Sequence, residues 1–182
     1  MTEKISRDKL ASKIVKASRI TGEFLLRSGA TSNVYFDKYR FESDPELLRN
    51  ITEHLAELIP AGTQRLVGLE MGGIPLATAL SLHTGIAAGF CRKRAKEYGT
   101  QLQLEGGISR GEKVTIIEDV VTSGGAAIEA VQVMRDPGMN IEILGLICVV
   151  DREAGAIVKF KELGIDFKPL FKWTELDSYI EQ

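Results

Sequence analysis

Short apolar runs alternate with helix-like patterns along most of the chain, and this alternation limits the possible folds more than any other feature of the sequence. Continuous apolar runs, which are typical of strands buried on both faces of a sheet, occupy residues 65–69, 86–91, 114–117 and 143–150. Apolar residues at helical spacing occupy residues 45–59, 75–82, 127–134 and 156–163. Strands that alternate with helices form βαβ units, so the sequence predicts the α/β class, with an open parallel sheet flanked by helices.

The chain of 182 residues has the size of one domain, and we expect residues 1–182 to fold as a single unit. Its first forty residues and its last fifteen fall outside the alternation. We expect these two segments, about 1–40 and the C-terminal end, to form a small cap, or hood, over one end of the sheet. Ligands of open parallel sheets bind beyond the carboxyl ends of the strands, so functional residues should lie just after each strand.

Charge and hydropathy exclude several classes of protein. The chain has 23 Lys and Arg against 25 Asp and Glu, a net charge of −2, whereas a general nucleic-acid coat would be strongly basic. The apolar run at 143–150 is far shorter than the ~20 residues of a membrane-spanning helix. Cys91 and Cys148 lie in apolar runs and are predicted to be buried free thiols, as in a reducing compartment. We therefore expect a cytoplasmic protein that binds neither nucleic acid nor a membrane.

The strongest chemical signal is an apolar strand that leads into two acids, Glu118 and Asp119, and then into the Thr-Ser-Gly-Gly loop at 122–125. This loop precedes a helix whose first backbone N–H groups can bind an anion, and its glycines let the backbone approach a phosphate closely. Carboxylates beside such a loop would repel a bare phosphate. They suit sugar hydroxyls, or a cation carried by a diphosphate. The segment therefore predicts a site for a phosphorylated sugar.

Two further strand ends carry groups that suit a diphosphate. Four of the five residues at 92–96 are Lys or Arg, and the glycine- and serine-rich stretch 98–111 follows them. This composition predicts a long mobile loop that could close its cations over a diphosphate. The turn at 70–75 places two glycines before Pro75, which is typical of an anion site formed by backbone N–H groups.

Residues near the N-terminus and after the last predicted strand suit a flat anionic ring. Residues 24–37 combine aromatic rings and hydroxyls with Arg27, and they could line a pocket for such a ring. A hairpin with buried aromatic side chains is an equally good interpretation of the same residues. Arg152 follows the strand at 143–150 and is a candidate partner for a carboxylate on the ring.

Other motifs in the chain do not fit their usual context. The Gly-x-Ser-x-Gly match at 107–111 precedes a strand, whereas a nucleophile elbow joins a strand to a helix. The same segment begins a P-loop spacing, but Glu112 stands where that motif requires Lys. His54 and His83 have no zinc-site spacing with the two cysteines, and we expect both histidines to be structural.

Together these segments resemble the type I phosphoribosyltransferases, and within them the orotate phosphoribosyltransferases, from about Phe24 to Gly155. The run at 114–126 is similar to the signature with which that family binds phosphoribosyl pyrophosphate (PRPP), with Glu118 where the first acid is often Asp. The Arg-Lys-x-x-Lys loop at 92–96 and the Asp-Arg-Glu run at 151–153 are similar to the orotate branch. The resemblance implies a type I phosphoribosyltransferase-like fold. It also implies an enzyme that transfers the phosphoribosyl group from PRPP to orotate, giving orotidine 5′-monophosphate and diphosphate in UMP biosynthesis.

The resemblance also implies a role for individual residues. The catalytic residues would be Lys93, Lys96, Glu118 and Asp119. The PRPP site would comprise Arg27, Met71, Gly72, Arg92, Lys93, Lys96, Tyr98, Glu118, Asp119, Val120, Val121, Thr122, Ser123, Gly124, Gly125 and Ala126. The orotate site would comprise Tyr35, Phe36, Thr122 and Arg152.

The turn at 70–72 departs from part of the family. Met71-Gly72 stands where some members have Tyr-Lys, so anion binding there would depend on backbone N–H groups. A related turn in the superfamily contains a non-proline cis peptide bond, and we expect one in this turn as well.

The resemblance further implies Mg²⁺, held mainly by PRPP, and a homodimer in which the loop at 92–111, with Lys93 and Lys96, reaches the partner's site. Two alternatives remain open. A purine phosphoribosyltransferase should lack an arginine placed for a ring carboxylate. A PRPP-sensing regulator that binds nucleic acid should carry a basic face or a basic appended domain, and the net charge of −2 counts against it.

Overall fold

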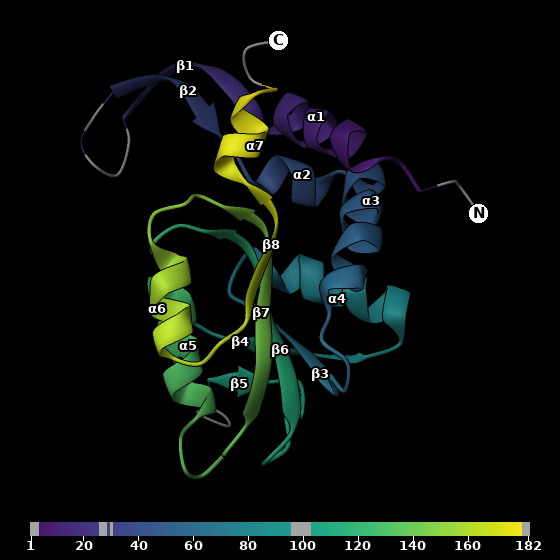
Figure 1. The fold of residues 1–182 in the computed structure, drawn as a ribbon, viewed down its shortest axis with the longest axis vertical. Coiled ribbons are helices and arrows are strands. Elements are labelled where there is room, and N and C mark those ends of the chain that lie inside the picture. Colours follow the sequence, from purple (N-terminus) through teal and green to yellow (C-terminus); the bar gives the residue numbers. More distant parts are fainter. Residues whose placement is uncertain (1–3, 26–28, 30, 96–102, 180–182) are drawn as a thin grey trace.

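The computed structural model describes residues 4–25, 29, 31–95 and 103–179, and a six-stranded sheet forms its centre. In spatial order the strands are β5 (Leu104–Glu105), β4 (Ala87–Cys91), β3 (Arg65–Leu69), β6 (Lys113–Val121), β7 (Glu142–Asp151) and β8 (Phe167–Lys172). All neighbouring pairs from β4 to β8 are parallel, and the short β5 runs antiparallel to β4. The predicted open, mostly parallel sheet is confirmed, with helices on both sides (Figure 1).

Helices cover the two faces of the sheet: α3 (Pro45–Leu55) and α4 (Gly73–Thr84) on one face, and α5 (Gly125–Met134) and α6 (Ala156–Glu162) on the other. Consecutive residues of a strand point to opposite faces. Leu66 accordingly packs with the α3 and α4 residues, and Val67 packs with the α5 and α6 residues. Both side chains are fully buried, which explains why these strands read as continuous apolar runs.

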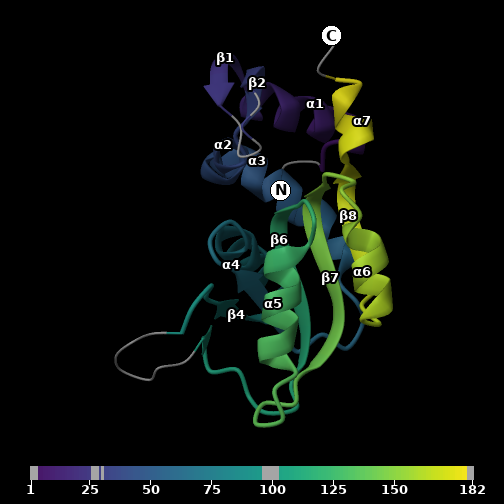
Figure 2. The same ribbon diagram turned by 90° about the vertical axis from the view of Figure 1, so that its left-hand side faces the viewer.

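Two segments from opposite ends of the chain form a hood over the carboxyl ends of the strands (Figures 1 and 2). The hood contains α1 (Arg7–Ser18), the antiparallel pair β1 (Arg19–Leu25) and β2 (Thr31–Phe36), α2 (Tyr39–Ser43) and α7 (Trp173–Asp177). Arg7 joins the two segments, because its guanidinium donates hydrogen bonds of 2.7 Å to the Leu170 carbonyl and to Glu175. The expectation that both chain ends contribute to a hood is therefore confirmed.

Local sequence signals explain where several helices begin. Asp44 caps α3 by accepting hydrogen bonds of 2.9 Å from the backbone N–H groups of Glu46 and Leu47, and Pro45 occupies the first turn, as predicted. The helix ends in a 3₁₀ turn over Ala56–Leu58, before Pro60. Its buried face carries the histidine that we expected to be structural: His54 contacts the Ile5 carbonyl at 2.9 Å.

The sheet differs from the prediction in three places. β6 continues through Val121, so the two acids lie within the strand and not after it. β8 comes from the segment that we assigned only to the hood, and its Pro169 lies on the edge strand of the sheet, where proline is tolerated. β5 lies within the stretch that we expected to be a mobile loop, and it pairs with the end of β4.

The structure confirms that Cys91 and Cys148 are free and buried. Within the described residues, no helix combines the length and the apolar character needed to cross a membrane.

Candidate active site

A cavity of about 620 Å³ lies where β3, β4 and β6 end beneath the hood. Met71 from the turn after β3, Lys93 from the segment after β4, Glu118 from β6 and residues 120–126 line it. The topology thus brings together three strand ends that the sequence analysis selected separately. Lys38 from the hood completes the lining, and no sequence motif pointed to it.

Of the two acids of β6, Glu118 lines this cavity, and Asp119 contacts Lys38 of the cavity lining. The Asp119 side chain is completely buried, and its Oδ2 is 2.5 Å from the ammonium group of Lys38. Its Oδ1 accepts a hydrogen bond from the Val120 backbone N–H. Glu118 has a buried Oε2 that lacks a hydrogen-bond partner among the described residues. Burial and the neighbouring Asp119 raise the pKa of Glu118 to about 8, although Lys38 and Lys93 oppose this shift.

A third carboxyl group, that of Glu42 on α2, lies against Asp119. Glu42 is only 7% exposed, and its Oε1 lacks a hydrogen-bond partner within the described part of the chain. Burial, and then the contact with Asp119, raises the pKa of Glu42 to about 9. Glu42 is therefore protonated at neutral pH in the free protein, which lets the two carboxyl groups approach each other.

The turn after β3 approaches these acids closely and contains the predicted cis peptide bond, between Glu70 and Met71. A Cβ atom at Gly72 would lie 1.7 Å from Oδ2 of Asp119 and 2.8 Å from Oε1 of Glu42. Only glycine fits at this position, because the carboxyl groups of Asp119 and Glu42 already occupy the space that a side chain would need.

The hydroxyl- and glycine-rich loop forms the opposite wall of the cavity. Thr122 and Ser123 are exposed, and Gly124 has a φ of 77°, a left-handed conformation that glycine adopts without steric cost. α5 begins at the next residue, so its first backbone N–H groups are available to an anion in the cavity. This is the geometry expected of a phosphate site.

The basic segment after β4 remains close to its own chain. The Lys93 backbone N–H donates to Oε2 of Glu70 at 2.9 Å, and Lys93 and Arg94 line the cavity. The Arg92 backbone N–H donates to the Gln103 carbonyl at 2.9 Å.

Three of the predicted site residues, Arg27, Lys96 and Tyr98, lie outside the described residues.

These contacts concern the described ends of the loop at 92–111, which we predicted to reach a partner's site. Residues 104–105 pair with β4, and the Gly111 backbone N–H donates to the Met139 carbonyl at 2.9 Å. Lys93 lines the cavity of its own chain, and its action on a partner's site stays a prediction. Backbone hydrogen bonds on both sides of 96–102 hold the described parts of this segment in place.

The residues predicted for orotate do not line the 620 Å³ cavity, except for Thr122. The Arg152 backbone N–H donates to the Val121 carbonyl at 2.8 Å, which places Arg152 directly beside Thr122. The Arg152 guanidinium carbon lies 3.6 Å from the centroid of the Trp173 ring. Phe36 packs edge-on against the same Trp173 ring, with centroids 5.2 Å apart.

The two predicted aromatic residues differ in their surroundings. Tyr35 is 45% exposed and stacks on Phe24 in the hairpin, with centroids 5.4 Å apart, whereas Phe36 contacts Trp173. They differ because neighbouring residues of β2 point to opposite faces of the strand. The structure therefore joins Phe36, but not Tyr35, to Arg152 through Trp173.

Sequence reasoning missed three residues around the site: Lys38, Glu42 and Trp173. Lys38 and Glu42 lie only seven residues or fewer beyond the predicted aromatic pair, but no spacing rule connects them to the acids of β6. Trp173 is the only tryptophan of the chain. Its uniqueness, in a segment predicted to belong to the hood, is the one sequence signal that could have marked it as a site residue.

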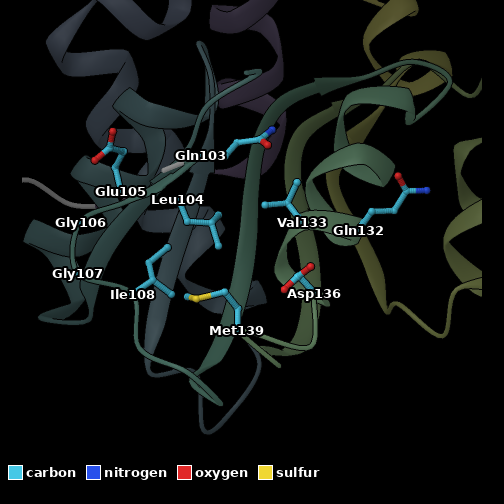
Figure 3. A pocket seen from close by; sticks show the side chains of 10 residues that line it. All are labelled: Gln103, Leu104, Glu105, Gly106, Gly107, Ile108, Gln132, Val133, Asp136 and Met139. Carbon is cyan, nitrogen blue, oxygen red and sulfur yellow. The ribbon is translucent and has the colours of Figure 1, made fainter. Parts of the chain in front are cut away.

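A second cavity, of about 720 Å³, lies away from the acids, between the β5 segment and the C-terminal half of α5 (Figure 3). Leu104, Ile108, Val133 and Met139 point into it. The described residues that line it include no Lys or Arg. This composition does not suit a phosphorylated sugar.

In the described part of the chain, no cluster of three or more His, Cys, Asp or Glu side chains could hold a metal ion.

Comparison with known proteins places this geometry in a family. A family model described as a phosphoribosyl transferase domain matches residues 40–169. The chain is 42% identical, over 93% of either chain, to the orotate phosphoribosyltransferase of Nocardioides sp. (strain ATCC BAA-499 / JS614).

Solved structures agree with this relationship. The Mycobacterium tuberculosis H37Rv orotate phosphoribosyltransferase in complex with Fe(III) dicitrate has a TM-score of 0.84 at 30% identity, covering 93% of this chain and 98% of that chain. The M. tuberculosis enzyme in complex with PRPP has a TM-score of 0.80 at 27% identity, covering 94% of this chain and 98% of that chain. The chain therefore belongs to the orotate phosphoribosyltransferase family.

Proposed function

We propose that this chain transfers the 5-phosphoribosyl group from PRPP to orotate, giving orotidine 5′-monophosphate and diphosphate in pyrimidine biosynthesis. One observation carries the proposal: Glu118 of β6 and the 122–126 loop line the same cavity as Lys38 and Lys93, and Lys38 contacts the second acid, Asp119. Acids for sugar hydroxyls, a helix N-terminus for a phosphate and cations for a diphosphate match the three parts of PRPP.

Each part of the site has a distinct task in this reaction. The 5-phosphate binds the backbone N–H groups of 122–126, and Glu118 and Asp119 accept hydrogen bonds from the ribose hydroxyls. A ring nitrogen of orotate forms a bond to ribose C1 while the C1–O bond to diphosphate breaks. The diphosphate leaves with the electron pair, and the ring N–H proton passes to the diphosphate or to solvent. The ribose gains positive charge in the transition state, which the acids stabilise, and Lys93 stabilises the negative charge on the departing diphosphate.

Arg152 selects the base by binding the orotate carboxylate. Its guanidinium face lies on Trp173, which leaves the N–H groups along the guanidinium edge free to form a bidentate pair with a carboxylate. Phe36 packs against the same tryptophan. A purine lacks the carboxylate, so this arrangement favours orotate over the purine alternative.

The proposed reaction uses Mg²⁺ held mainly by the oxygens of PRPP. Mg²⁺ commonly binds substrate phosphates and few protein carboxylates. The described residues fit this mode, because Glu118, which lines the cavity, has one buried carboxylate oxygen without a hydrogen-bond partner among them. When bound, the ion would neutralise charge on the diphosphate.

The free, buried thiols of Cys91 and Cys148 are consistent with an enzyme of the cytoplasm.

We also propose that the enzyme is a homodimer in which residues around Lys96 act on the partner's PRPP. Because Lys93 lines the cavity of its own chain, we assign the exchange to Lys96 and test Lys93 separately.

A competition assay tests the proposed reaction. The purified chain is supplied with PRPP, Mg²⁺, orotate, adenine, hypoxanthine and uracil together, and the nucleotide products are separated. We expect orotidine 5′-monophosphate as the main product and one equivalent of diphosphate for each orotate consumed. Formation of a purine nucleotide in preference to orotidine 5′-monophosphate would contradict the proposal. Specific binding of DNA or RNA without turnover would favour the regulator.

A further inference from the structure

Lys38 is a cation inside the active-site cavity that the reaction as described above does not use. It immediately precedes α2, and its side chain is one-third exposed, whereas the Asp119 side chain that it contacts is fully buried. The ammonium group lies 2.5 Å from Oδ2 of Asp119. Burial alone would lower the pKa of Lys38, but the contact with Asp119 raises it above its ordinary value, so Lys38 is charged.

The contact between Lys38 and Asp119 competes with the sugar. Oδ1 of Asp119 accepts the Val120 backbone N–H. Oδ2 has no backbone donor among the described residues, and we assign it to a ribose hydroxyl. Lys38 holds that oxygen in the free protein. When a hydroxyl takes Oδ2, the ammonium group must find another anion, because an unpaired charge inside a half-buried cavity is costly.

The diphosphate of PRPP is the anion that enters with the sugar. The turn at Glu70-Met71-Gly72 offers no side-chain cation, and a side chain at Gly72 would collide with Asp119. Lys93 and Arg94, which follow β4, also line the cavity and supply cations there. Lys38 is therefore the described cation that can approach the diphosphate from the hood.

We propose that Lys38 binds the diphosphate of PRPP, and that it leaves Asp119 for the diphosphate when the ribose hydroxyls bind Asp119. This inference depends on the proposed function for the identity of the ligand. One residue thereby links sugar binding at the acids to diphosphate binding at the other end of the cavity, and it holds the acid neutralised while the site is empty.

The test measures binding of two fragments of PRPP, inorganic diphosphate and ribose 5-phosphate, by calorimetry. Lys38→Met removes the charge. Lys38→Gln removes it but keeps a hydrogen-bond donor beside Asp119, so it serves if the first variant folds poorly. Arg40→Gln is the matched control, because Arg40 is an exposed cation of α2 that pairs with Asp37 at 3.7 Å.

We expect both Lys38 variants to bind diphosphate about tenfold or more weakly, since a charge-assisted hydrogen bond is lost. Binding of ribose 5-phosphate should be unchanged or tighter, because its hydroxyls no longer compete with Lys38. In steady-state kinetics KM for PRPP should rise while KM for orotate stays the same. Arg40→Gln should behave as the wild type in all three measurements.

Unchanged diphosphate binding together with tighter ribose 5-phosphate binding would overturn the proposal, because Lys38 would then be only an internal counter-ion of Asp119. Equal losses for both fragments, or the same losses in Arg40→Gln, would also overturn it. The fragment measurements need no orotate, so they remain distinct from a failure of the proposed reaction, which would show as absent orotate turnover in the wild type.

Discussion

Asp119 contacts groups from three separate segments of the chain. It lies against Glu42, pairs with Lys38 and blocks any side chain at Gly72. Because the Asp119 side chain is fully buried, a hydrogen bond that it accepts from a ribose hydroxyl is weakly screened and gains strength as the ribose becomes positive. Its charge therefore matters most in the transition state.

We expect Asp119→Asn to lower kcat/KM for PRPP on the order of 10²-fold, the effect of losing one charge-assisted hydrogen bond in a desolvated site. The melting temperature should fall, because Lys38 loses its buried counter-ion, so the kinetics are measured at a temperature where the variant stays folded. Asp166→Asn is a suitable control, since Asp166 forms an exposed ion pair with Lys168 at 2.9 Å. Wild-type kinetics in the Asp119 variant would remove this residue from the mechanism.

The raised pKa values of Glu42 and Glu118 predict how stability changes with pH. Both acids ionise near 4.5 in the unfolded chain, but at about 9 and about 8 in the folded protein. Between these limits the folded state binds more protons than the unfolded state, so stability falls as pH rises. The cost is absent below pH 4.5 and reaches its full size above the folded pKa values.

We therefore expect the melting temperature of the ligand-free enzyme to fall steadily from pH 5 to pH 9. Glu42→Gln removes one of the two groups and should flatten this fall, while it preserves the contact with Asp119. Scanning calorimetry across the pH range measures both curves. A variant whose curve runs parallel to that of the wild type would show that Glu42 does not titrate in this window.

At the scale of elements, the sequence was most informative where one pattern had one physical cause. Asp44-Pro45 predicted the start of α3 because a capping carboxylate and a proline both suit a first helical turn. The strand at 65–69 was predicted with its observed ends, because it is buried on both faces. α1 was missed although its buried residues follow helical spacing: Leu10, Ala11, Ile14, Val15 and Ser18.

β8 shows why some elements escaped prediction. Its sequence contains Pro169 and charged residues, which argue against a central strand. Its place at the edge of the sheet makes both acceptable, but the sequence does not reveal that place. The β5 strand is only two residues long, and it exists because its partner β4 is already in position.

α7 contributes Trp173, and we expect this residue to determine how well Arg152 is positioned. Trp173→Leu should raise KM for orotate about tenfold, in line with the loss of a partly desolvated cation–π contact, while KM for PRPP stays nearly constant. Arg152→Ala should raise KM for orotate on the order of 10²-fold, because the carboxylate loses its partner.

The double variant distinguishes positioning from packing. If Trp173 acts through Arg152, adding Trp173→Leu to Arg152→Ala should cause little further loss in orotate binding, because the two effects are coupled. Independent, additive losses would mean that the tryptophan supports the hood in general and has no specific effect on the arginine.

At the scale of the whole molecule, the site exists only because the hood closes over the sheet. Lys38, Glu42 and Trp173 come from the hood, and their contacts with Asp119 and Arg152 span long distances in the sequence. Sequence reasoning found the strand-end residues, because parallel strands must end at a common edge. It could not find the hood residues, because no periodicity links them to that edge.

The proposed dimer can be tested by mixing two inactive chains. Lys96→Ala removes a cation of the segment proposed to reach the partner, and Asp119→Asn disables the acid of a chain's own cavity. Each variant alone should be nearly inactive. In a hybrid dimer, one site then receives both lesions and the other receives neither. Random mixing makes about half of the dimers hybrid, so activity should recover to about a quarter of the wild-type value.

Lys93 provides the matched control for this mixture, because its side chain lines the cavity of its own chain. In a hybrid of Lys93→Ala and Asp119→Asn, each site carries one lesion, so no activity should return. Recovery in the Lys96 mixture without recovery in the Lys93 mixture would mean that the crossing to the partner begins between these two residues. If neither mixture recovers although size measurements show dimers, residues 93–96 act within one chain and the exchange is wrong. Recovery in both mixtures would instead mean that substrate binding moves Lys93 out of its own cavity.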